Sequence, residues 1–176
     1  LQGLAMAGGA EAALFGRMTT GDLLSRMDSP LQVAHMLTTH AAADESDFQS
    51  SGDELLGLAQ LGHTGSAVLT QSPLAGGIFY GYLCVDVPGL VANTTGAARE
   101  QTAAADREPA ARLVERLVHL AYGVAPRARQ TQHASQARAD LMLLEITEGA
   151  NRQLSSAFRT PSAPEMDAAA RQLADA

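Results

Sequence analysis

Apolar and polar positions alternate with a period of two over residues 31–40, which is typical of a strand with one set of side chains on each face. This run holds two histidines, His35 and His40, and two threonines, which is unusual for the core of an ordinary strand. Residues 78–87 combine aromatic and aliphatic side chains and end at a Pro-Gly pair. Both runs therefore predict strands.

Two further apolar runs also predict strands. Residues 12–18 are mostly apolar and end in Gly16, Arg17 and Met18, which we interpret as the end of a first strand. Residues 141–146 form a nearly continuous apolar run, which is typical of a strand at the centre of a sheet.

Helical patterns are clear in two later segments. Residues 106–123 carry an apolar stripe at helical spacing, and Asp106 is the predicted cap. A last helix is predicted over residues 164–174, because Ser162 and Glu165 form the pattern of a capping box at its start.

Residues 43–77 differ from the rest of the chain in being rich in Gly, Ser, Thr and Asp. This segment is too long for an ordinary loop inside a compact domain, and such insertions are usually functional arms or lids. Within it we expect a short helix over residues 54–60 and a short strand over residues 66–70. Phe48 lies among polar residues, which favours either a stacking or partner surface or a ring that folds back on the domain.

The predicted order is strand, strand, long arm, strand, helix, strand, helix. That order suits an α+β sheet with helices on one face, and it looks like part of a ferredoxin-like or RNA-recognition fold. A chain of 176 residues is long enough for one such domain with a sizeable core.

The net charge of −7 argues, taken alone, against nucleic acid as a partner, although local patches decide such contacts. Arg127, Arg129 and Gln130 belong to a polar donor cluster that suits phosphates and base edges, or else to a solvated loop before a strand. The single cysteine, Cys84, excludes an internal disulfide. With neither a bilayer-spanning apolar run nor a signal peptide, the chain is expected to be cytoplasmic.

The sequence offers no strong catalytic or metal-binding pattern. His35 and His40 fall on opposite faces of a strand, so they cannot share a metal ion without a bulge. Residues 62–66 are rich in Gly but lack the Lys and the strand-to-helix turn of a phosphate-binding loop. The acidic residues of the segment 43–77 favour a solvated loop, with Mg²⁺ binding or acid–base catalysis as the alternative. We therefore expect neither an enzyme nor a cofactor.

Seven segments, in order and with similar spacing, resemble the crRNA-binding backbone subunit of the type I-E CRISPR Cascade complex, the CasC family. They are ALFGRM (13–18), VAHMLTTH (33–40), HTG (63–65), GIFYGY (77–82), PRARQ (126–130), ADLML (139–143) and LSSAF (154–158). The resemblance covers nearly all of this chain but only the later portion of the family's sequence. Since the chain also begins at Leu1 rather than Met, we expect a portion upstream of it.

The resemblance implies a hand-shaped subunit that binds crRNA without cleaving it. An RNA-recognition-like palm would hold the guide, and a long β-hairpin thumb would kink it at regular intervals. The implied division is palm at residues 1–42 and 78–160, thumb at residues 43–77 and a C-terminal helix at residues 161–176. Implied partners are crRNA, the target DNA strand, further copies of the chain in a filament and other Cascade subunits, with no membrane.

The resemblance also implies which residues contact RNA. On the palm they are Gly16, Arg17, Met18, Arg127, Arg129 and Gln130, and on the thumb they are Phe48, Leu61, His63 and Thr64. The chain departs from the family on the thumb. Asp47 stands beside Phe48 where the family has a second aromatic residue, and Thr64 replaces an apolar residue, for which Leu61 could substitute after a slip in register. On the palm, Arg129 replaces a Lys and adds bidentate geometry.

Two other functions are compatible with the sequence. One is RNA cleavage by a thumb carboxylate, with Asp53 as the candidate, as in the backbone subunits of type III systems, to which the family is distantly similar. The other is a structural remnant that oligomerises without RNA.

Overall fold

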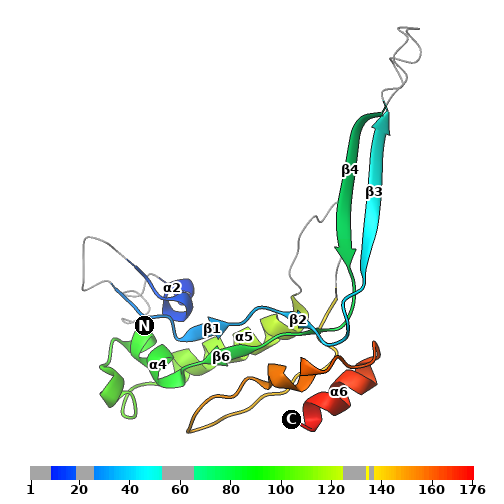
Figure 1. Cartoon of the computed structure of the whole chain (residues 1–176). Helices are drawn as coiled ribbons and strands as arrows, with labels where there is room; N and C mark the ends of the chain where they lie inside the picture. The colour runs from blue at the N-terminus through cyan, green and yellow to red at the C-terminus, as the bar shows by residue number, and fades with distance from the viewer. Residues whose placement is uncertain (1–8, 19–25, 53–65, 125–133, 135–136) are drawn as a thin grey trace. The chain divides into compact units, whose positions relative to one another are not determined.

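The computed structural model describes residues 9–18, 26–52, 66–124, 134 and 137–176 (Figure 1). Within this described part the strands form two-stranded antiparallel sheets, accompanied by α-helices and short 3₁₀ helices. The chain divides into two compact units, the first made of Leu1–Met36 with Gly81–Gln153 and the second of Leu37–Tyr80 with Leu154–Ala176. The α+β class predicted from the sequence is therefore confirmed.

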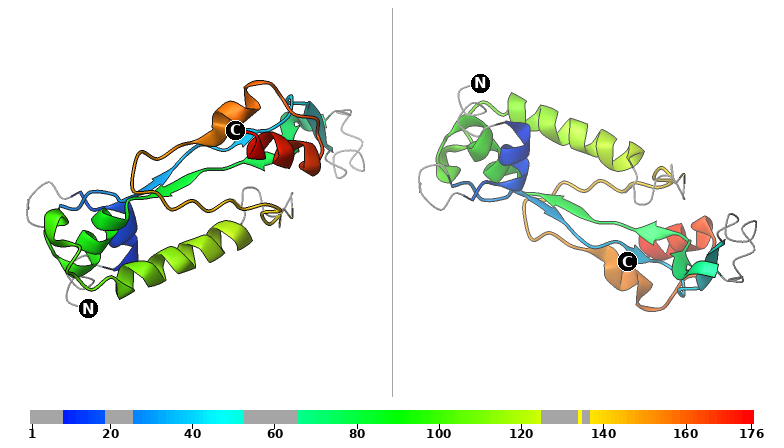
Figure 2. Two further views of the ribbon diagram at one scale, coloured as in Figure 1. Left: turned by 90° about the horizontal axis from the view of Figure 1, so that it is seen from below. Right: turned by 90° about the horizontal axis from the view of Figure 1, so that it is seen from above.

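The first unit packs helices around one small sheet. Strand β1 (Leu31–Val33) pairs with β6 (Leu83–Val85). Helices α2 (Ala10–Phe15) and α5 (Glu108–Gly123) both pack against α4 (Val87–Thr95), as Figure 2 shows. The core consists of small and aliphatic side chains buried between these helices, namely Ala13, Leu90, Val91 and Ala110.

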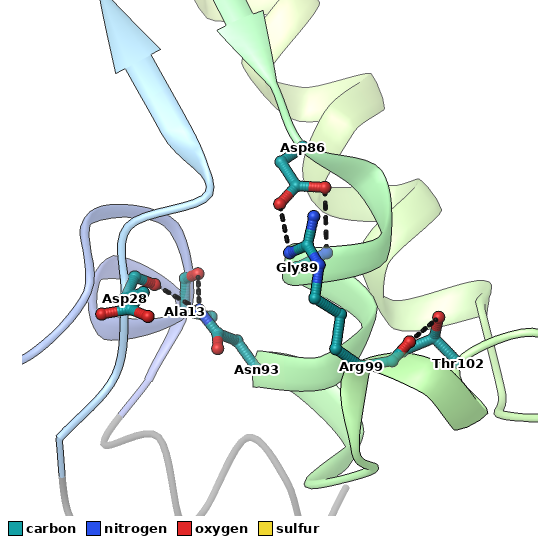
Figure 3. Close-up of polar contacts among 7 residues, drawn as sticks. All are labelled: Ala13, Asp28, Asp86, Gly89, Asn93, Arg99 and Thr102. Carbon is teal, nitrogen blue, oxygen red and sulfur yellow. Dashed lines mark hydrogen bonds and ion pairs between the residues drawn. The ribbon is translucent and has the colours of Figure 1, made fainter. Parts of the chain in front are cut away.

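Helix α4 begins at an aspartate that both caps the helix and forms an ion pair. Asp86 is the N-cap, and its Oδ1 accepts a hydrogen bond from the backbone N–H of Gly89 at 3.2 Å. The guanidinium of Arg99, in the 3₁₀ helix η2 (Arg99–Gln101), donates to the other carboxylate oxygen (Figure 3). A Cβ atom on Gly89 would lie 2.6 Å from Oδ2 of Asp86 and 3.0 Å from Nη1 of Arg99, so a larger residue would have to displace the side chains of this ion pair.

The second unit contains a long two-stranded ribbon. Strand β3 (Asp44–Gly52) pairs antiparallel with β4 (Ser66–Ala75), and we call this ribbon the arm (Figure 1). Strand β2 (Leu37–Thr38) pairs with β5 (Phe79–Tyr80), and the 3₁₀ helix η3 (Leu154–Arg159) and helix α6 (Met166–Ala174) complete the unit.

Strand β5 and η3 are held together by an aromatic pair and a hydrogen bond. Phe158 is buried, and its ring centroid lies 5.5 Å from that of Tyr80. The backbone N–H of Leu154 donates to the Tyr80 hydroxyl at 3.1 Å. The C-terminal part of the chain is thereby joined to the strand that follows the arm.

Two predicted helices are confirmed, with small shifts at their ends. Helix α5 covers Glu108–Gly123, and Oδ1 of Asp106 accepts from the backbone N–H of Glu108 at 3.0 Å. Helix α6 begins at Met166. The predicted capping box is wrong, because the Ser162 hydroxyl donates to the carbonyl of Thr39 at 3.1 Å instead of capping the helix.

The strand predicted at residues 12–18 is wrong, because the structure has helix α2 over Ala10–Phe15. Three of the six helical residues are alanine, which has the highest helix propensity, and Ala13 is fully buried. After the helix, Arg17 forms an isolated antiparallel bridge with Met27. An apolar run this short fits a buried helical turn as well as a strand.

The strands predicted at residues 31–40 and 78–87 are each divided in two. Strands β1 and β6 belong to the first unit, whereas β2 and β5 belong to the second. The second run also ends early, because Asp86 caps helix α4 and Pro88 occupies its first turn. The Pro-Gly pair that predicts a strand end therefore marks a helix start, where proline is equally suited.

The strand predicted at residues 141–146 is wrong. Residues 141–147 adopt no regular structure, and the apolar side chains there are exposed, Ile146 by 93%. No strand pairs with this segment in the described part of the chain. An apolar run forms a stable strand only where neighbouring strands receive its backbone hydrogen bonds and its side chains. The strand predicted at residues 66–70 is the start of β4, and residues 54–60 lie outside the described residues.

Candidate nucleic-acid interface

The register of the arm gathers its exposed apolar side chains on one face. Phe48 pairs with Gln71, and Ser50 pairs with Leu69. Residues two apart on a strand share a face, so Phe48 and Leu69 are diagonal neighbours across the ribbon. Their exposed fractions are 65% and 64%. Phe48 therefore does not fold back on the domain, which was one of its two predicted environments.

Polar side chains flank this apolar pair on the same face. Nε2 of Gln71 donates to the Ser46 hydroxyl at 2.9 Å, which fixes the amide directly beside Phe48. The opposite face differs, because Asp47 accepts a hydrogen bond from Nε2 of Gln49 at 2.8 Å and Ser72 is buried. The face of Phe48 thus presents an aromatic ring, an aliphatic side chain and an amide, with the carboxylate of Asp44 at one end, and the other face presents the carboxylates of Glu45 and Asp47.

The charge of the arm limits what it can bind. No Lys or Arg occurs between Arg26 and Arg99, whereas this stretch holds seven acidic residues. Asp44, Glu45 and Asp47 all lie in β3. These charges repel phosphate groups over a distance of roughly 8 Å at physiological ionic strength. The arm is therefore chemically suited to the neutral faces of bases and not to a phosphate backbone.

Three predicted palm residues lie in the described part of the first unit. Gly16 has φ 76° and ψ 175°, and its backbone N–H donates to the carbonyl of Ala12. Arg17 exchanges two backbone hydrogen bonds with Met27, both at 2.9 Å. Its side chain is exposed, and Met18 beside it is 80% exposed. Arg17 thus has a fixed backbone and an accessible guanidinium.

The remaining predicted site residues lie outside the described residues. On the palm these are Arg127, Arg129 and Gln130, and on the thumb they are Leu61, His63 and Thr64. Arg17 belongs to the first unit and Phe48 to the second. Asp53, the candidate for an RNA-cleaving carboxylate, also lies outside the described residues.

Leu69, Ser46 and Gln71 were not identified from the sequence as site residues. The sequence predicts a short strand over residues 66–70, but it does not say which residue lies opposite Phe48. The register across the ribbon supplies that information, because it pairs Ser50 with Leu69. A hairpin register depends on the length and geometry of its connection, which the composition of residues 53–65 does not define.

Two other kinds of feature, a metal site and a membrane-spanning helix, are not found among the described residues. Among the described residues, no group of His, Cys, Asp and Glu side chains is arranged to hold a metal ion. No helix in the described part of the chain has the length and apolar character needed to cross a bilayer.

Solved structures share this fold, and two of them are chains of the following complexes. A chain of a "CRISPR RNA-guided surveillance complex, pre-nicking" matches with a TM-score of 0.74 and 23% sequence identity, over 95% of this chain and 43% of that chain. A chain of a "CRISPR RNA-guided surveillance complex" matches with a TM-score of 0.66 and 22% identity, over 99% of this chain and 63% of that chain. The present chain thus spans less than two thirds of the length of either structure.

Sequence comparisons give one further result. No curated protein matches the chain. The model of the family described as CT1975-like protein matches residues 2–176. Because this match extends over nearly the whole sequence, the chain belongs to the CT1975-like protein family.

Proposed function

We propose that this chain is a guide-RNA-binding subunit of a CRISPR surveillance complex and that it is not itself an enzyme. The observation that carries the proposal is the arm face on which Phe48 and Leu69 lie exposed beside the Gln71 amide. The fold shared with chains of RNA-guided surveillance complexes and the family membership support it. The type I-E backbone subunit, stacked with copies of itself, is the specific form that we favour.

In this proposal the two units have different tasks. Arg17, together with Arg127, Arg129 and Gln130, would contact the RNA phosphates, in an RNA-recognition-like palm. The arm would act as the thumb and kink the guide, leaving the bases between kinks free to pair with a target DNA strand. Contacts to the backbone carry no sequence information, so a subunit built in this way accepts any guide.

The apolar face of the arm suits the energetics of a kink. Separating two stacked bases exposes their faces to water, and stacking a base on an aromatic side chain recovers about 1–3 kcal/mol. Phe48 offers one such ring, and Leu69 can fill the space beside it. The carboxylates on the arm disfavour close approach of phosphates, so the bases and not the backbone would meet the ribbon.

The proposal is tested with single substitutions on the two faces of the arm. Phe48→Ala and Leu69→Ala should each weaken binding of a single-stranded RNA oligonucleotide, by about 5- to 150-fold for Phe48→Ala, which corresponds to about 1–3 kcal/mol. Gln49→Ala and Thr70→Ala, the adjacent positions on the opposite face, serve as matched controls and should leave the affinity unchanged. Fluorescence anisotropy measures the affinity, and thermal unfolding is followed for every variant.

Two results would contradict this role of the arm. If Phe48→Ala lowers the melting temperature strongly and leaves RNA affinity intact, the ring contributes to packing and not to binding. If Gln49→Ala weakens RNA binding as much as Phe48→Ala does, the apolar face has no special part in binding.

Cleavage of a complementary RNA in the presence of Mg²⁺ would favour the enzymatic alternative. Purified material with the ultraviolet absorbance ratio of bare protein, and no affinity for added RNA, would favour the structural remnant.

A further inference from the structure

The backbone hydrogen bonds at the base of the arm depart from the regular ladder. The N–H of Thr39 donates to the carbonyl of Ile78 at 3.0 Å, next to the β2–β5 pair. In a regular antiparallel pair the N–H of Ile78 would donate back to the carbonyl of Thr39. That carbonyl instead accepts from the backbone N–H of Ser162 at 2.8 Å and from its hydroxyl at 3.1 Å.

Because the Thr39 carbonyl accepts from Ser162, the N–H of Ile78 needs another acceptor, and the side chain of His40 provides it. The N–H of Ile78 donates to Nε2 of His40 at 3.2 Å. Nδ1 of the same ring lies 2.8 Å from the carbonyl oxygen of Ala41. Because a carbonyl only accepts, Nδ1 must carry the proton and Nε2 must be the bare nitrogen. The contact with Ile78 therefore requires the neutral imidazole in one tautomer.

Gly77 makes room for this ring. Its φ is 151°, and a Cβ atom there would lie 2.1 Å from Nε2 of His40 and 2.6 Å from Cε1. The imidazole thus occupies the space of a missing side chain, immediately before the residue whose N–H it accepts. The ring thus joins the segment that leads out of β4 to the segment that leads into β3, in addition to the hydrogen bond from the Thr39 N–H to the Ile78 carbonyl.

Protonation of His40 would break the join. In the imidazolium both ring nitrogens carry protons, so Nε2 would direct an N–H at the N–H of Ile78. The neighbouring titratable groups along the packed segments are Asp44 in β3, Tyr80 in β5, and Arg159 and Glu165 on either side of Ser162. None of them forms an ion pair with His40 among the described residues.

We propose that His40 is a proton-sensitive latch at the base of the arm. The neutral ring holds the N–H of Ile78 while the Thr39 carbonyl binds Ser162. Protonation releases this N–H and leaves Ile78 bound through its carbonyl to the N–H of Thr39, so that the base of the arm is held less firmly. Because the closed latch excludes the proton, opening becomes more favourable as the pH falls through the range in which histidine changes its charge. This device is independent of RNA and goes beyond the proposed function.

The test is amide hydrogen exchange of the protein without RNA, measured by NMR between pH 5 and pH 8 and corrected for the intrinsic exchange rate at each pH. The protection of the Ile78 N–H should fall as the pH is lowered from 8 to 5, because one proton is taken up on opening. The N–H of Leu90, inside helix α4, should keep its protection and reports on global unfolding. His119→Gln, which removes an exposed histidine of α5, should leave the profile unchanged.

Substitutions at His40 distinguish the hydrogen bond from Ile78 to the ring from the packing of the ring itself. His40→Gln offers an amide oxygen that accepts from Ile78 without titrating, so protection should persist and lose its pH dependence. His40→Phe keeps a ring but has no acceptor, so protection of Ile78 should be low at every pH. The proposal is overturned if protection of Ile78 does not vary with pH in the unsubstituted protein. It is equally overturned if the loss is shared by Leu90, or if His40→Gln retains the same pH dependence.

Discussion

Gly16 combines a backbone conformation that favours glycine with a close approach to another segment. Its φ is 76°, and a Cβ atom would lie 2.6 Å from the carbonyl oxygen of Met27 and 2.8 Å from the backbone nitrogen of Ser29. We predict that Gly16 contacts RNA, and its backbone conformation and close contacts also give it a structural role.

Gly16→Ala should lower the free energy of unfolding by about 2 kcal/mol or more, since a non-glycine residue in this region costs about 1–3 kcal/mol before any collision is counted. Urea unfolding measures the change. Gly123→Ala is the control, because it ends helix α5 with nothing within 4 Å of the added methyl group. An equal effect of the two substitutions would mean that the close approach at Gly16 is not present in solution.

Asp86 links the stability of the first unit to pH. The hydrogen bond from Arg99 lowers the pKa of Asp86, partial burial acts in the opposite direction, and the Gly89 N–H lowers it further. A folded pKa below the unfolded value means that the unfolded state binds more protons. This contribution to stability is therefore complete above about pH 5, and it is lost as the pH falls below about 4 and through the folded pKa.

Asp86→Asn should reproduce the acidic limit at neutral pH. Asparagine is as good an N-cap as aspartate, so the variant keeps the contact with Gly89 but loses the charge that faces Arg99. The protein should be more stable than this variant at pH 7, and the difference should shrink as the pH falls below about 4. Urea unfolding across this range measures it. A difference that stays constant with pH would show that the ion pair is not responsible.

The side chain of Asn93 adds hydrogen bonds to the packing of helices α2 and α4. Nδ2 of Asn93, in α4, donates to the carbonyl of Ala13 at 3.0 Å and to that of Asp28 at 2.9 Å (Figure 3). The amide thereby ties α4 to α2 and to the segment that leads into β1.

Asn93→Ala should lower the free energy of unfolding by about 1–3 kcal/mol, because it leaves carbonyl oxygens without their donor. Asn93→Asp should cost more, since a carboxylate has no proton to donate and repels both carbonyls. Thermal unfolding ranks the two variants. An Asn93→Ala variant as stable as the unsubstituted protein, or more stable, would indicate that the contacts of Asn93 contribute less than the better helix propensity of alanine does.

The sequence identifies elements whose pattern is long and locally determined. Helix α5 could be predicted because sixteen residues repeat an amphipathic pattern, whereas helix α6 was expected from a capping-box pattern that its start does not contain. Helix α2 could not, because a mostly apolar stretch of six residues fits two periods equally well. The predicted strand at residues 141–146 failed for another reason: strand formation depends on a partner that the sequence of the strand itself does not encode.

The distribution of charge over the whole chain divides it into regions with different attraction for nucleic acid. All twelve basic residues lie within residues 17–26 and 99–171. Arg17 is exposed, whereas Arg112 is paired with Glu108 at 2.7 Å on α5.

If Arg17 contacts an RNA phosphate, Arg17→Ala should lower the slope of log affinity against log salt concentration by about 0.7 for a single strand. Combining it with Arg129→Ala should lower the slope by about twice as much. Arg112→Ala is the control and should leave the slope unchanged. Titrations of labelled RNA at several salt concentrations measure it. An unchanged slope in the double variant would exclude both arginines from the RNA contact.

Only part of the candidate site could be predicted, because the sequence of a strand does not show which residues of its partner lie beside it. Phe48 and Arg17 stand out in the sequence, one as an aromatic residue among polar ones and the other as a basic residue after an apolar run. Leu69 and Gln71 do not, because their importance comes from the register that places them beside Phe48. Composition identifies which residues are unusual, whereas pairing between distant segments determines which of them act together.

The arm described above is held mainly by its backbone ladder, and most of its described side chains face water. Substitutions at such positions usually change stability by less than about 0.5 kcal/mol. Mutation can therefore alter the chemistry of the arm while the rest of the molecule folds as before. A substitution of Asp47, whose carboxylate accepts from Gln49 on the ribbon, would be a change of this kind. An arm without a core lets related proteins diverge in what they contact at little cost to folding.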